Sequence, residues 1–88
     1  SVPGPDYVFE EDYNLTSLES IQVYVQKNKH LPEVPSAVQM EEEGIDLGVM
    51  NMLLLKKVEE LTLHLIEQDK VNKEQASQIA ELRKLIAN

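Results

Sequence analysis

Cysteine is absent from this 88-residue chain, so neither a disulfide nor a thiolate metal site can stabilise the fold. Tryptophan is also absent, and one phenylalanine and three tyrosines leave little aromatic area for a core. A chain of this size that folds alone buries only about 60% of its unfolded surface. Association with another chain is therefore the source of stability that this composition favours, and we expect no cofactor and no metal.

Basic residues are few: 8 lysines and arginines face 16 acidic residues, giving a net charge of −8. Such a charge repels nucleic-acid phosphates and anionic lipid headgroups. No apolar run reaches the roughly 18 residues that a membrane span needs, and no charged segment precedes an apolar one as in a signal peptide. We expect neither nucleic-acid binding nor membrane insertion, with any export signal upstream on a longer parent protein.

The acidic residues are unevenly distributed along the chain. Residues 1–45 hold nine Asp and Glu against two Lys, whereas residues 46–88 hold seven against six Lys and Arg. The sequence predicts a single domain with two parts that differ in surface charge. We expect residues 1–5, with two prolines and a glycine, to be a linker, residues 6–45 a collar of short elements, and residues 46–88 a long helix.

The collar begins with a short β-favouring run, Asp6-Tyr7-Val8-Phe9, which is too brief to be stable alone. We expect it to be an extended segment packed on the long helix. Tyr7 and Phe9 are the predicted anchors, with Val8 between them, because aromatic side chains can bury the most area.

A first short helix is predicted from about Ser17 to Lys27, after a capping box that pairs Thr16 with Glu19. Its apolar face would carry Leu18, Ile21 and Val25. The apolar residues in this stretch also alternate as in a strand, but the cap and the length favour a helix.

An irregular segment follows, because proline restricts the residue before it and cannot donate to a ladder. It contains His30, Leu31, Pro32 and Pro35, which we assign to the collar packing. We expect the His30 imidazole to hydrogen-bond to loop backbone. A catalytic role is less favoured, because no nucleophile arrangement surrounds this histidine.

A second capping box, from Ser36 to Gln39, predicts another short helix that ends at Gly44 in the left-handed region. Asp46 is the expected N-cap of the long helix. The glutamates at 41–43 are read as a solvated helix end, with attraction of a cation as the less favoured alternative. The acidic residues around Asp6 lack the spacing of a calcium loop and are not read as a metal site.

The long helix carries a heptad repeat, whose a and d positions form one apolar stripe. At 1.5 Å per residue this helix would be roughly 60 Å long and could not bury the stripe by itself. We therefore predict self-association through these positions, which we call the seam. The seam consists of Leu47, Asn51, Leu54, Val58, Leu61, Leu65, Gln68, Asn72, Gln75, Ile79, Leu82 and Ile86.

The pattern gives further detail on the seam. Four apolar residues in the first half of the helix, namely Met52, Leu55, Leu63 and Ile66, lie outside it and need a second cover. Three successive polar layers, from Gln68 to Gln75, either fix register or limit association strength. Valine or isoleucine at a with leucine at most d positions favours two strands, so a dimer follows from the residue rule alone.

Several strings along the chain resemble the C-terminal domain of tail-fibre-like proteins of Bacteroidetes bacteria and their phages. The likeness runs from Asp6 to about Leu65. The strings that carry it are Asp6-Tyr7-Val8-Phe9, Tyr13 with Ser17-Leu18-Glu19, His30-Leu31-Pro32-Glu33-Val34-Pro35-Ser36, Gly44-Ile45-Asp46-Leu47-Gly48 and Val58-Glu59-Glu60-Leu61-Thr62-Leu63.

This resemblance implies a mainly α fold in which the long helix forms a parallel homotrimeric coiled coil, with a dimer as the alternative. It also implies a role like that of the intramolecular chaperones of phage tail spikes, which align three chains so that the upstream fibre of the same chain can assemble. The location would be extracellular, on a bacterial surface or a virion. A receptor- or partner-binding tip is the second reading. We expect no enzyme: phage domains that cleave themselves use a serine string that Ser1 and its neighbours do not match.

Overall fold

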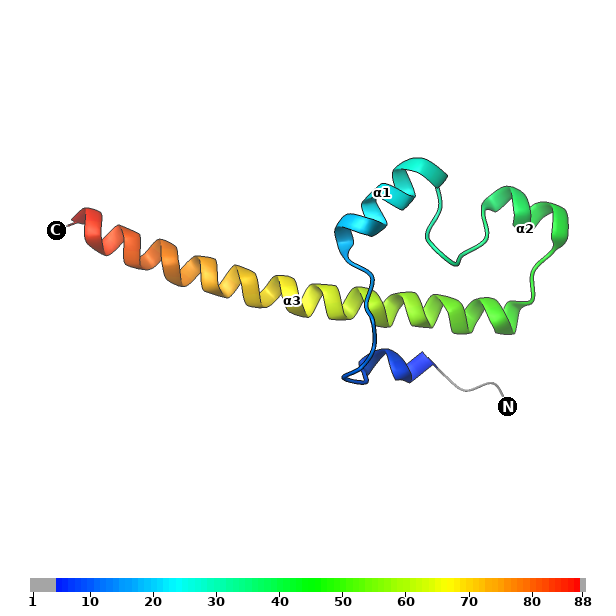
Figure 1. Ribbon diagram of the computed structural model, residues 1–88, viewed down its shortest axis with the longest axis horizontal. Helices are drawn as coiled ribbons and strands as arrows, with labels where there is room; N and C mark the ends of the chain where they lie inside the picture. The colour runs from blue at the N-terminus through cyan, green and yellow to red at the C-terminus, as the bar shows by residue number, and fades with distance from the viewer. Residues whose placement is uncertain (1–4, 88) are drawn as a thin grey trace.

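The computed structural model describes residues 5–87, and within this range the chain is helical and contains no strand. The elements are η1 (Pro5–Phe9), α1 (Leu18–Asn28), α2 (Ala37–Glu43) and α3 (Leu47–Ala87). Figure 1 shows α3 as a long rod that runs far beyond the other elements, and the molecule measures 66 × 31 × 18 Å. The expected linker at 1–5 lies outside the described residues except for Pro5, as does Asn88.

The long helix has the predicted extent. Asp46 caps its start, since the Val49 amide donates to Asp46 Oδ1 at 3.0 Å. Gly48 is accommodated in the first turn, and no other residue of α3 breaks a helix. Within α3 only Glu59 is buried, so this helix depends on packing that one chain does not provide.

The first element differs from the prediction, because residues 5–9 form a 3₁₀ helix and not an extended run. Pro5 supplies a φ that suits the start of a helix, and the Glu10 amide donates to the Tyr7 carbonyl at 3.1 Å in the turn that follows. Val8 is 1% exposed and Pro5 is buried, whereas Tyr7 and Phe9 are about half exposed. In a 3₁₀ helix side chains three residues apart share a face, so the small residues face inward and the aromatics flank them.

The two short helices have the predicted positions. In α1 the N-cap is Ser17, whose Oγ accepts from the Ser20 amide, so the capping box expected at Thr16 is wrong by one residue. In α2 the capping box of Ser36 with Gln39 is present in both directions. Gly44 ends α2 with φ 74° and ψ −176°, a region open to glycine but outside the left-handed helical region expected for it.

The short elements lie on two sides of α3 and contact it unequally. Figure 1 shows η1 on one side of α3 and α1 with α2 on the other, joined by a segment that crosses the helix. Among the described elements, η1 makes the extended contact with α3, whereas α1 and α2 stand away from it. The small core therefore lies between η1 and the first half of α3.

Candidate association surface

The seam of α3 is open to solvent along its whole length in this single chain. Its apolar members range from 46% exposed at Leu54 to 84% exposed at Ile86. An apolar stripe of this length exceeds what a monomeric protein ordinarily leaves in water. The predicted seam is thus an exposed apolar surface in the single chain.

The contacts between η1 and the helix fall on the side of α3 opposite the seam. Counting from Leu54 at d, the residues that approach η1 are Lys56 at f and Glu59 at b, both on the outer face of a coiled-coil helix. The Lys56 Nζ lies 5.8 Å from the centroid of the Tyr7 ring. Because η1 occupies the outer face, it leaves the seam free for another chain.

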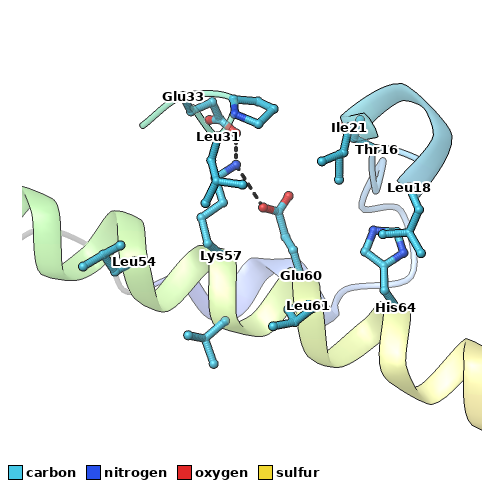
Figure 2. Close-up of a pocket in the computed structure, with 12 residues that line it drawn as sticks. Thr16, Leu18, Ile21, Leu31, Glu33, Leu54, Lys57, Glu60, Leu61 and His64 are labelled. Carbon is cyan, nitrogen blue, oxygen red and sulfur yellow. Dashed lines mark hydrogen bonds and ion pairs between the residues drawn. The ribbon is translucent and has the colours of Figure 1, made fainter. Parts of the chain in front are cut away.

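A polar cluster fastens the collar to α3. The Tyr13 hydroxyl donates to Glu60 Oε2 at 2.6 Å, across 47 residues of sequence. Lys57 Nζ lies 3.2 Å from Glu60 Oε1 and donates to Glu33 Oε1 at 2.9 Å. Burial and the Glu60 carboxylate raise the pKa of Tyr13 to about 12. The cluster joins the segment after η1 and the loop before α2 to the helix. Figure 2 shows three of its members, Glu33, Lys57 and Glu60.

Glu33 is the loop residue of this cluster, and its backbone is strained. It has φ 69°, a conformation that costs a residue other than glycine about 1 kcal/mol or more. Its carboxylate accepts from Lys56 at 2.8 Å as well as from Lys57. These two lysines lower the pKa of Glu33, and the Glu33 carboxylate in turn raises the pKa of Lys56. The ion pairs therefore offset the strain and hold the loop beside α3.

Among residues 5–87, Glu59 is the one buried charged residue, at 8% exposed, and its Oε1 has no hydrogen-bond partner there. Burial first, and then the Asp6 carboxyl, raise the pKa of Glu59 above its ordinary 4.5. Two carboxyl groups at one contact cannot both ionise without repulsion. The junction of η1 with α3 is therefore sensitive to pH.

An apolar groove of about 520 Å³ opens between α1, the loop at residues 31–33 and α3. Figure 2 shows Leu18 and Ile21 of α1 on one wall, with Leu54 and Leu61 of the seam below. The groove exists because α1 does not close onto its own helix. Seam residues and collar residues thus line one surface. The sequence patterns of the two segments did not reveal this.

The two histidines have different surroundings. His30 Nδ1 donates to the Leu31 carbonyl at 2.9 Å, and its ring packs edge-on against Tyr24, which confirms the expected bond to loop backbone. His64, at heptad position g, lies in the groove wall beneath Leu18. Its Nε2 is buried without a hydrogen-bond partner in the described part of the chain.

The remaining candidate residues differ in their contacts and exposure. Gln68 donates to Asn72 Oδ1 at 2.9 Å, so two of the polar seam residues satisfy each other within one helix. The collar residues Val25, Pro32 and Pro35 are half-buried, whereas the acidic run at 41–43 is exposed. Residues 5–87 contain no group of three or more His, Cys, Asp or Glu that could hold a metal ion.

Sequence reasoning missed the polar cluster almost entirely. The spacing of Lys57 and Glu60 is a recognisable helix pair, but nothing in the sequence indicates that Tyr13 or Glu33 would reach them.

None of the helices in residues 5–87 combines the length and the apolar character that crossing a membrane requires. Comparisons with protein-family models, curated proteins and solved structures give no match for this chain.

The bond from Tyr13 to Glu60 should stabilise the collar. We predict that Tyr13→Phe lowers the free energy of unfolding by about 1 kcal/mol, because the Glu60 carboxylate loses a partly buried donor. Urea denaturation followed by circular dichroism measures the change. Tyr24→Phe, which removes a hydroxyl from α1 outside this cluster, is the control, and an equal loss in both variants would contradict the assignment.

The carboxyl pair at η1 should make stability depend on pH. A raised pKa means that the folded state favours protonated Glu59, so this contribution is present below about pH 4.5 and is lost as pH rises through the raised value. We predict that Glu59→Gln, which stays neutral, raises Tm near neutral pH and changes it little in acid. Thermal melts across this range, with exposed Glu67→Gln as control, test the sign; a lower Tm for Glu59→Gln at neutral pH would refute it.

Proposed function

We propose that this chain is a trimerisation module with a chaperone-like role, which holds three copies in parallel register so that a longer fibrous protein can assemble. The observation that carries the proposal is the position of the collar: η1 and the polar cluster engage the outer flanks of α3, and the seam is left uncovered. A protein that is stable as a monomer would bury this apolar stripe beneath side chains of its own.

The strand number is the point on which the residue rule and the resemblance disagree. A two-stranded coiled coil needs only the narrow a/d stripe, whereas here the flanking e and g positions also carry Leu55, Val71 and Leu85. Leu55 is 44% exposed and Leu85 is 74% exposed. This wider apolar face supports three strands over two, in agreement with the resemblance to tail-fibre domains.

The chaperone-like role follows from the physics of assembling fibrous chains. Pairing long chains through non-local contacts has a slow and entropically costly nucleus. A local helical clamp raises the effective concentration of the other chains and sets their register before the rest folds. On this proposal the parent is a surface or virion fibre outside the cell, and this chain acts as its assembly point.

A binding tip is the second candidate, and the exposed acidic run at 41–43 on α2 is the observation that favours it. A partner recognised there would carry basic groups. Reversing these three charges would abolish such binding and leave the oligomer intact, so the two functions can be separated by experiment.

We predict that changing Leu61 and Leu65 to Asp converts the oligomer to monomer, because two charges would enter successive seam layers. The measurement is solution mass by light scattering, combined with helicity by circular dichroism. In the parent fibre the same changes should leave the chains unassembled.

The matched control carries aspartate at Val49 and Lys70, both at heptad position f on the outer face of α3. It introduces the same number of aspartates without touching the seam. The proposal fails if the control dissociates as readily as the seam variant, or if the seam variant keeps the mass of the unaltered chain.

A further inference from the structure

The apolar groove beside α3 lies on one flank of the seam. Its floor is formed by Leu54, Val58 and Leu61 at seam positions, and its far wall by Leu18 and Ile21 of α1. Lys57 and His64 also line it, and both occupy heptad position g. The groove therefore continues the seam outward on the g side of the helix.

The other flank of α3 presents an apolar edge of its own. Leu55 lies at position e, and Met52 and Ile66 lie at position b next to it. These three side chains are 41% to 48% exposed, and η1 leaves them partly uncovered. Sequence reasoning expected the chain's own collar to cover them, but α1 stands over the opposite flank.

In a parallel in-register coiled coil the g flank of one helix faces the e flank of its neighbour. In this register Lys57 and His64 of the groove face Thr62 and Asp69 at the e positions of the next copy. The groove on one copy thus meets the flank of the next helix that carries the apolar edge. The same contact repeats from chain to chain, so it closes as a ring around the axis.

We infer that the groove between α1 and α3 seats the α3 helix of a second copy of this chain, through its edge of Met52, Leu55 and Ile66. Each collar then clasps the neighbour's helix, and α1 completes its packing only in the assembly. This inference rests on the proposed function, and it adds which elements of two chains make contact.

The electrostatics of the groove suit this occupant. At its rim, Glu33 pairs with Lys56 and Lys57, and Glu60 pairs with Lys57. Two lysines thus balance two carboxylates, so the rim does not repel another acidic chain. The in-register alignment also brings His64 at g next to Asp69 at e of the neighbouring copy. The His64 Nε2, which has no partner in the described part of its own chain, gains an acceptor nearby.

Cysteine cross-linking tests the contact directly, because the chain contains no cysteine of its own. One chain carries Leu18→Cys on α1, and a second chain with a longer tag carries Ile66→Cys on α3. The two are unfolded together, refolded as a mixture and treated with a short bis-maleimide. The expected result is a covalent product containing one chain of each length.

The control replaces Leu18→Cys with Val23→Cys, which is on α1 but outside the groove and 62% exposed. The inference predicts that this mixture gives little product. Efficient cross-linking with Val23→Cys, or none with Leu18→Cys in an oligomer of normal mass, would overturn the clasp while leaving the proposed function in place.

A same-chain double variant, Leu18→Cys with Leu61→Cys, tests whether α1 closes on its own helix instead. A cross-link confined to single chains in the intact oligomer would contradict the clasp. Light scattering on every sample gives the mass of the assembly, and so shows whether the clasp alone is wrong or the proposed function is wrong as well. If the chains remain monomers, the proposed function and the inference both fail.

Discussion

The exposed stripe of α3 is the constraint on which the rest of this structure depends. A helix of 41 residues in which only Glu59 is buried cannot be held by its own propensity alone. Its apolar residues are arranged with a period that a copy of the same helix can match. The collar leaves most of this stripe accessible: η1 packs on the outer face, and the polar cluster fixes the collar at one flank. The first short helix, α1, borders only the stretch from Leu54 to Leu61, across an open groove.

The fastening of the collar combines modest interactions that act together. Glu33 accepts from two lysines, and Glu60 is shared between Lys57 and Tyr13, so one network ties two segments to the helix. Single surface ion pairs contribute little, but a connected set with low exposure of both lysines contributes more. Glu59 beside Asp6 works against this at neutral pH, because two carboxyl groups at one contact repel each other when both are ionised.

The extent of the long helix and the positions of both short helices could be predicted from sequence, because capping residues and heptad spacing are local signals. The 3₁₀ turn at η1 could not, since Tyr7, Val8 and Phe9 favour strands and only the packing of Val8 decides the outcome. The heptad pattern predicted the seam, but it did not predict what packs against the flanks of the seam. The sequence indicated that Met52 and Ile66 need an apolar partner, but not whether the partner belongs to the same chain or to another copy. Tyr13 and Glu60 are too far apart in sequence for any local rule to pair them.

Burial of the uncovered α3 stripe by copies of the same chain can be measured by sedimentation equilibrium, because the mass it gives does not depend on molecular shape. If copies cover the stripe, the unaltered chain forms a single species with three times the mass of one chain over a range of concentrations. A species with the mass of one chain at every concentration would contradict this burial.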